Sequence, residues 1–235
     1  MHKSLGNGVD PYDIMNKYGA TSSACGPPPP TTTRHALLGK IFKQLSQNYL
    51  KFRNTARYCL GNLDGFDPNH LVAPNEMEAL DRWAITRLNG LIQKCFQGYD
   101  DFDFNVVTHA VNDFCVVDMS NFYLDIIKDR LYCGAEAERR SAQTALYHIL
   151  DGMTRLIAPI LAFTSDEIWH AMKHAQGVNA ESVLFNDMPG DNAAFALDAA
   201  AKDRWAKLVS LRDAVNKALE NARNAGVFKK PRTPT

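Results

Sequence analysis

The segment from Glu136 to Pro159 constrains the fold more than any other part of this sequence. Its apolar side chains recur at alternating steps of four and three residues: Ala142, Leu146, Ile149, Met153, Leu156 and Ile160. This spacing draws one apolar stripe along a helix and is typical of the seam where bundled helices pack together. Pro159 lacks a backbone N–H and is expected to kink or end the helix. The stripe therefore favours burial against other helices.

Three further long helices are predicted by the same kind of periodicity, over about 37–61, 75–98 and 104–132. Asn75 and Glu78 have the spacing of a capping box that would open the second of these. The apolar face of the third is expected to consist of Val107, Val111, Phe114, Val117 and Ile127.

The remaining chain predicts shorter or later elements. Thr164 and Glu167 would cap a short helix that carries Trp169, and residues 182–185 (SVLF) are a candidate strand. A last helix is predicted over about 199–225, with a buried side made of Trp205, Leu208, Val215 and Leu219. The expected fold class is therefore all-α, an antiparallel helical bundle followed by a trailing helix.

Composition narrows the class of protein. The 235 residues are 46% hydrophobic and 22% charged, which are globular values. No apolar run reaches the roughly 18 residues of a membrane span, and residues 1–10 lack the features of a signal peptide. Five isolated cysteines without a C-x-x-C pair argue against a zinc site or a disulfide framework and suit a reducing cytoplasm.

The common catalytic motifs are missing. The sequence contains no dinucleotide-binding, P-loop or nucleophile-elbow pattern. His170 and His174 could align two metal ligands on one helix, but no third ligand is evident, and no metal is expected. Cys115 is interpreted as a core residue rather than a nucleophile. The three carboxylates Asp118, Asp125 and Asp129, with Arg130 beside the last, are interpreted as surface pairs rather than acid–base catalysts.

Charge is distributed unevenly although the net charge is zero. Residues 34–63 contain six Lys or Arg residues and no acid. Such a helix can steer a polyanion, although it can also be a solvated basic face. The residues expected to meet RNA are Lys43, Arg53, Asn54 and Arg57. The neighbouring aromatic residues Tyr49, Phe52 and Tyr58 suit contacts with unstacked bases, with Phe52 also expected in the core.

Several segments resemble a known family in its order and spacing. They are KFRNTARYCLGNLDGFDP (51–68), EMEALDRWAITRL (76–88), FYLDIIKDRLY (122–132), RRSAQTALYHIL (139–150) and RLIAPILAFTSDEIW (155–169). Over about 41–190 the chain resembles the anticodon-binding domain of bacterial-type isoleucyl-tRNA synthetases, which are class I enzymes. Valyl enzymes share this fold but look less similar. The resemblance implies binding of tRNA(Ile), with Arg139, Arg140 and Lys217 as peripheral phosphate contacts.

The flanks are also similar to the family. Residues 1–20 resemble its K-M-S-K-S loop and the helix after it, so Lys3 and Ser4 are expected to be remnants of an ATP-binding loop; the first Lys is missing and His2 replaces a Ser. Residues 205–223 resemble the junction helix that follows the bundle. The family's Rossmann domain with its H-I-G-H signature, editing domain and zinc module are absent. The fragment is therefore expected not to activate isoleucine alone. ATP with Mg²⁺ belongs to the full-length enzyme, whose missing catalytic part is an expected partner.

These features divide the chain into four parts: a loop remnant at 1–20, a Pro-rich linker at 21–40, the anticodon-binding domain at 41–190 and a truncated junction at 191–235. Two segments, 21–36 and 231–235, look foreign to the family. Codons chosen for ATSSACG, read from their third base, encode DIIRLW, which the family carries at this place. We hypothesise that both segments are out-of-frame translations; a genuine Pro-rich linker is the alternative. With its four consecutive prolines, 21–36 is expected to be extended, loosely packed and mobile.

Overall fold

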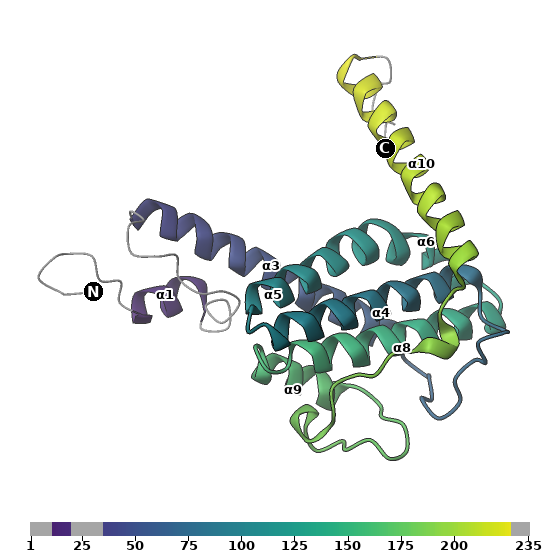
Figure 1. Ribbon diagram of the computed structural model, residues 1–235, viewed down its shortest axis with the longest axis horizontal. Coiled ribbons are helices and arrows are strands. Elements are labelled where there is room, and N and C mark those ends of the chain that lie inside the picture. The colour runs from purple at the N-terminus through teal and green to yellow at the C-terminus, as the bar shows by residue number, and fades with distance from the viewer. Residues whose placement is uncertain (1–10, 20–34, 227–235) are drawn as a thin grey trace, which may run out of the picture. The chain divides into compact units, whose positions relative to one another are not determined.

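The computed structural model describes residues 11–19 and 35–226 (Figure 1). Every regular element in these ranges is a helix, which confirms the predicted all-α class. The chain divides into two compact units, Met1–Ala196 and Leu197–Thr235. Lys3 and Ser4, most of 21–36 and the tail at 231–235 lie outside the described residues. Residues 35 and 36, which were expected to be extended, begin a helix instead.

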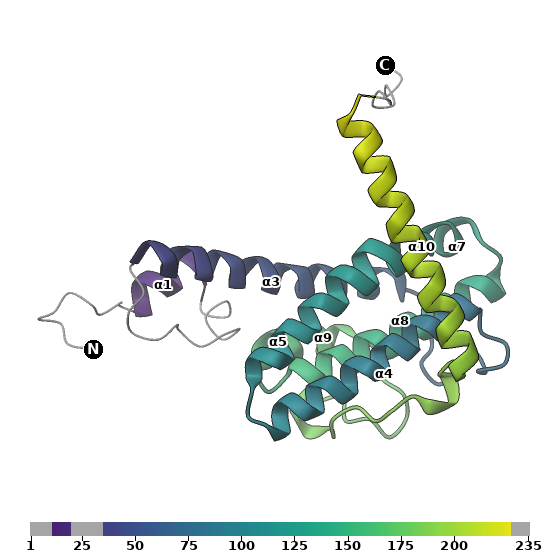
Figure 2. The same ribbon diagram turned by 45° about the horizontal axis from the view of Figure 1, so that its top comes forward.

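The first unit is a helical bundle built around α4 (Ala79–Asp100) and α8 (Glu136–Ile157). Helix α4 packs against α8 and against α5 (Phe104–Asp113), and the three lie side by side in Figure 2. Helix α3 (His35–Asn62) contacts α8 and α5, and α9 (Ala162–Ala171) packs on α8. A short helix, α1 (Pro11–Tyr18), contacts α3. None of the described helices is long and apolar enough to cross a membrane.

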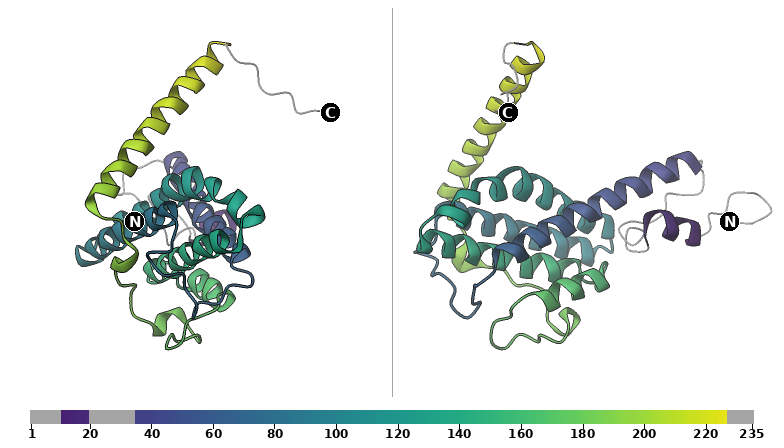
Figure 3. Two further views of the ribbon diagram at one scale, coloured as in Figure 1. Left: turned by 90° about the vertical axis from the view of Figure 1, so that its right-hand side faces the viewer. Right: turned by 180° about the vertical axis from the view of Figure 1, so that it is seen from behind.

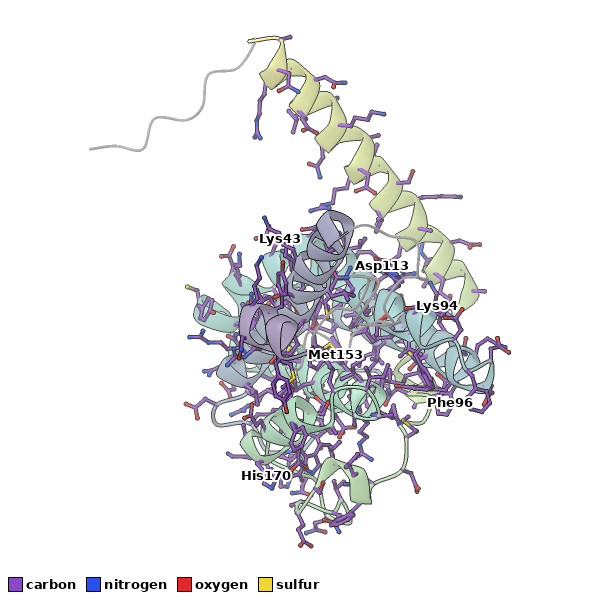
Figure 4. The ribbon with its side chains drawn as sticks, turned by 90° about the vertical axis from the view of Figure 1, so that its left-hand side faces the viewer. Lys43, Lys94, Phe96, Asp113, Met153 and His170 are labelled. Atoms are coloured by element: carbon purple, nitrogen blue, oxygen red, sulfur yellow. The ribbon has the colours of Figure 1, made fainter. Side chains whose placement is uncertain are left out.

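The core follows the predicted seam of α8. Ala142, Leu146, Ile149, Met153 and Leu156 are all fully buried. Figure 4 shows Met153 among the side chains inside the bundle. The helix ends at Ile157, two residues before Pro159, as the sequence predicts. Ile160, the sixth residue of the apolar stripe, therefore lies beyond its end.

Two core contacts show how closely the helices approach. The Cys115 thiol donates to the Met153 sulfur at 3.4 Å, so the expectation that Cys115 is a core residue is confirmed. A Cβ at Gly152 would lie 3.3 Å from two methyl carbons of Leu88, so glycine allows α8 to approach α4 at this point. Both contacts lie where the packing leaves no room for a larger side chain.

The helix predicted over 104–132 is not one α-helix. It comprises α5, a π-helix η2 (Phe114–Tyr123), α6 (Leu124–Ile126) and α7 (Lys128–Cys133). In the π-helical part the ladder runs five residues back, and the Ser120 hydroxyl donates to the Cys115 carbonyl across the same interval at 2.8 Å. The wider turn changes which residues face inward. Phe114 and Met119 are buried, whereas Val117, predicted on the apolar face, is 57% exposed.

The predicted caps were wrong. Helix α4 begins at Ala79 without a side-chain cap, and the Glu78 backbone N–H donates to the Ser141 hydroxyl at 2.9 Å instead. Helix α9 begins two residues before Thr164, whose hydroxyl is 3.3 Å from that of Tyr49. Ser141 from α8 thus takes the place of the predicted cap at α4, whereas the Thr164 hydroxyl contacts a residue of α3 instead of capping α9.

The predicted strand at 182–185 is also wrong. Residues Val183–Phe185 form a 3₁₀ turn, η3, and Ala193–Phe195 form another, η4. The Asp166 carboxylate accepts hydrogen bonds from the Ser182 hydroxyl and the Val183 backbone N–H, which fix this segment on α9 rather than in a sheet.

The second unit contains one described helix, α10 (Ala199–Asn224), visible in both views of Figure 3. The Asp198 side chain caps it by accepting from the Ala201 N–H at 2.7 Å. The predicted buried side is wrong for Leu208, Val215 and Leu219, which are all exposed. Between residues 197 and 226 no second helix is available to cover that side.

Candidate nucleic-acid interface

Helix α3 has two faces of opposite character. Its 28 residues contain no Asp or Glu. Phe52, Ala56 and Cys59 are buried against the bundle, and the expectation that Phe52 belongs to the core is confirmed. A helix that is anchored on one side in this way presents its other side to solvent as a fixed surface.

The exposed face carries the residues expected to meet RNA. Lys43, Arg53, Asn54 and Arg57 are all exposed, and Figure 4 shows Lys43 at the edge of the molecule. Arg53 and Arg57 are four residues apart and therefore neighbours on the helix surface. None of these four side chains makes a hydrogen bond or ion pair with another residue in the described ranges. We name these four residues the basic face of α3.

Two of the aromatic residues expected to meet RNA bases, Tyr49 and Tyr58, contact other helices of the bundle through their hydroxyls. The Tyr58 hydroxyl donates to the Leu124 carbonyl at 3.3 Å, and burial raises the pKa of Tyr58 well above its ordinary value. The Tyr49 hydroxyl lies beside that of Thr164. These hydroxyl contacts join α3 to the rest of the bundle, and both rings are half-buried.

The three residues expected to be peripheral phosphate contacts differ in exposure and in partners. Arg139 is exposed near the start of α8. Arg140 is half-buried: its guanidinium donates to Glu136 at 2.7 Å, to the Gly65 carbonyl at 3.0 Å and to Gln143 at 2.9 Å. It therefore fastens the segment after α3 to α8. Lys217 is exposed on α10, in the other unit.

An ion-pair network that the sequence did not reveal holds the bundle at the start of α4. The Asp81 side chain is fully buried and accepts two hydrogen bonds from Arg130, at 2.7 and 2.9 Å. It accepts two more, from the Tyr123 hydroxyl at 2.7 Å and the Ser141 hydroxyl at 2.6 Å. Burial raises the pKa of Tyr123, and the neighbouring carboxylate raises it further.

This network corrects the surface pairing expected for Arg130. Its partner lies 49 residues away rather than beside it, and Lys128 pairs with Asp125 at 2.8 Å. The ion pairing expected for Asp118 is present, because the Arg87 guanidinium donates two hydrogen bonds to its carboxylate at 2.9 and 3.2 Å. No local sequence signal distinguishes the two arginines.

The two histidines near the C-terminal end of α9 each place one ring nitrogen against a backbone carbonyl close by in the sequence. The His174 ring lies 4.2 Å from the Trp169 ring, and its Nε2 is 2.9 Å from the Trp169 carbonyl. The Nδ1 of His170 is 2.8 Å from the Asp166 carbonyl. In the described part of the chain, no three His, Cys, Asp or Glu side chains cluster as metal ligands would.

The fold and the sequence place the chain in a family. Residues 81–233 match the family model of the anticodon-binding domain of tRNA ligases, and the chain belongs to that family. More specifically, it is 44% identical over 95% of its length to an isoleucine–tRNA ligase from Caldicellulosiruptor bescii. It is also 44% identical over 97% of its length to the enzyme from Syntrophotalea carbinolica. The chain spans about a quarter of the length of each of these relatives.

A solved structure shows the same fold. A leucyl-tRNA synthetase from Agrobacterium radiobacter, in a ternary complex with tRNA and LeuAMS, is similar over 84% of this chain and 23% of its own, with a TM-score of 0.51. At 19% identity this likeness concerns the architecture alone. The identity to isoleucine–tRNA ligases confirms the resemblance to isoleucyl enzymes, and the valyl alternative is not favoured.

Proposed function

We propose that this chain binds tRNA through the basic face of α3. One observation carries the proposal: an acid-free helix holds Lys43, Arg53, Asn54 and Arg57 in solvent without partners among the described residues. Cations of this kind neutralise phosphates and release counterions, and guanidinium groups also contact unstacked bases. Arg139, Arg140 and Lys217 are proposed as peripheral phosphate contacts.

The proposed partner is tRNA(Ile), because the relatives named above are isoleucine–tRNA ligases. The full-length enzyme would attach isoleucine to this tRNA using ATP with Mg²⁺. Lys3 and Ser4 are proposed as the surviving part of its ATP-binding loop, and the missing catalytic part of the synthetase as a second partner. A cytoplasmic location fits this role.

The fourfold division also remains a proposal: loop remnant 1–20, linker 21–40, anticodon-binding domain 41–190 and junction 191–235. Sequencing of the gene tests whether 21–36 and 231–235 are out-of-frame products. The hypothesis fails if neither shifted frame encodes the family's residues.

Two assays separate the candidate functions. A fluorescence titration with tRNA(Ile) is expected to show saturable binding, and an ATP–pyrophosphate exchange assay with isoleucine is expected to show no activity. Exchange activity would contradict the proposal that the chain binds without catalysing. An absence of tRNA binding at low salt would favour a purely structural bundle, and equal affinity for all tRNAs would favour a free-standing tRNA-binding module.

A further inference from the structure

The corner where α4 passes into α5, seen in Figure 2, presents two phenylalanine rings to solvent. Phe102 is 82% exposed and Phe104 is 49% exposed. The Phe104 ring lies 6.0 Å from that of Tyr99, whereas Phe102 extends from the tip of the turn. Large apolar groups that are exposed side by side are typical of surfaces that bind another protein.

The backbone holds Phe102 in a conformation that favours glycine. Its φ is +56°, and its N–H donates to the Tyr99 carbonyl at 3.1 Å. The N–H of the next residue, Asp103, donates to the Gly98 carbonyl at 2.8 Å, which completes the cap at the end of α4. Glycine is the usual residue at this position because it has no Cβ. The chain thus keeps a bulky exposed ring where glycine would fold more easily, and such strain persists most often at sites that bind other molecules.

The same corner is strongly acidic. Asp100, Asp101 and Asp103 flank the two rings, and all three are exposed. The sequence has no Lys or Arg from 95 to 127. A polyanion is repelled by such a surface, so the matching surface is apolar and positively charged. We name residues 100–104 the acidic corner.

Helix α10 carries a surface with the matching character. Four of its apolar side chains are between 43% and 62% exposed, and at about 100° per residue they share one side of the helix. They are Leu208, Leu211, Val215 and Leu219, which we name the apolar stripe of α10.

The charges of α10 are sorted around this stripe. Residues four apart are neighbours on a helix surface, and four cations stand four positions from a leucine of the stripe: Arg204, Lys207, Arg212 and Arg223. None of the three acids of the helix is three or four positions from any member of the stripe; these acids are Asp203, Asp213 and Glu220. The stripe is therefore bordered by positive charge alone.

We propose that copies of this chain associate with one another, with the acidic corner of one copy seated on the apolar stripe of α10 of a second copy. Like surfaces repel, because paired corners would oppose acid to acid and paired stripes would oppose cation to cation. The unlike pair buries apolar groups on both sides and brings opposite charges together. Because the two surfaces differ, each copy takes part in up to two such contacts, in a closed pair or in a longer assembly.

This association goes beyond the proposed tRNA binding and does not depend on it. Lys217, the phosphate contact proposed on α10, is not three or four positions from any member of the stripe. The basic face of α3 belongs to neither surface. Failure of tRNA binding therefore leaves this inference standing, and the reverse also holds.

Sedimentation equilibrium of the full chain without nucleic acid, over a wide range of protein concentration, tests the proposal. The mean mass is expected to rise above that of one chain as the concentration increases, and to fall again in concentrated sodium chloride, which screens the opposite charges. Phe102→Gly removes the ring and is expected to raise the dissociation constant at least about tenfold. Because glycine suits the backbone at this position, thermal denaturation should show that the variant is as stable as the wild type.

A matched pair of variants tests the part played by α10. Arg204→Glu reverses a charge beside the stripe and should weaken the association. Lys202→Glu makes the same change in charge two positions earlier, away from the stripe, and should leave the dissociation constant unchanged. A mass that stays at one chain at every concentration overturns the proposal. Undiminished association of Phe102→Gly, or equal effects of Arg204→Glu and Lys202→Glu, also overturns it.

Discussion

Arginine serves opposite purposes in two regions of the molecule. Arg130 is largely buried, with 19% of its side chain exposed, and it meets a fully buried carboxylate through two hydrogen bonds. Arg57 stands in solvent on a helix without acids. The bundle thus uses a fully paired arginine to fix its own architecture and leaves exposed the arginine that we propose contacts tRNA. The position of the partner, not the residue type, decides between the two roles.

The largest effect on the free energy of unfolding is expected at the buried ion pair of Arg130 and Asp81. Asp81→Ala leaves Arg130, Tyr123 and Ser141 without their shared acceptor, and the free energy of unfolding should fall by about 3–5 kcal/mol. Urea denaturation followed by circular dichroism measures this change. The matched control is Asp118→Ala, which also removes a carboxylate with two bonds to an arginine. Asp118 is itself only 13% exposed, but Arg87 is 53% exposed and stays solvated when its partner is removed, so that change should cost less, about 1 kcal/mol. Equal losses in the two variants would contradict the distinction between architectural and surface pairs.

A buried histidine, His148, is expected to make the stability of the bundle depend on pH. Burial lowers the pKa of His148 to about 4 from an ordinary value of 6.5, and its ring packs 4.8 Å from that of Phe195. Because the folded state holds the neutral ring, this contribution to stability is complete above pH 6.5 and is lost as the pH falls through 4. Its full size is about 3 kcal/mol.

Unfolding free energies of the wild type and His148→Gln, measured from pH 7 to pH 4, test this expectation. The wild type should lose about 3 kcal/mol more than the variant over this range. Parallel curves for the two proteins would show that His148 does not contribute to acid sensitivity.

The smallest effect on the free energy of unfolding is expected at Arg57, the exposed arginine of the comparison. Arg57→Ala removes no contact with another described residue, so the free energy of unfolding should change by no more than about 0.5 kcal/mol. Thermal denaturation monitored by circular dichroism provides the comparison. A loss of several kcal/mol would show that Arg57 is part of the architecture after all.

The sequence predicted those features that depend on neighbouring residues. The boundaries of α3, α8 and α10 follow from local periodicity and from Pro159, and they agree with the structure to within a few residues. The π-helix could not be predicted, because the sequence has no pattern that distinguishes its five-residue hydrogen-bond spacing from that of an α-helix. Val117 was therefore assigned to the wrong face.

Features assembled from distant segments were also missed. The partner of Arg130 lies 49 residues away, and the Gly65 carbonyl that Arg140 contacts lies 75 residues away. The capping signals failed for the same reason, because Ser141 on another helix binds the N–H of Glu78. For the candidate site, the sequence could identify the charged face of α3, whereas only the packing shows that its cations lack partners within the bundle.

The salt dependence of tRNA binding tests the central claim most directly. Each phosphate contact contributes about 0.7–0.9 to the slope of log affinity against log salt concentration. Arg57→Ala should weaken the binding of tRNA(Ile) and reduce this slope by about one unit. Lys94→Ala, which removes an exposed cation from α4 (Figure 4), should leave affinity and slope close to those of the wild type. An unchanged slope in Arg57→Ala, or an equal reduction in Lys94→Ala, would contradict the assignment of tRNA binding to the basic face of α3.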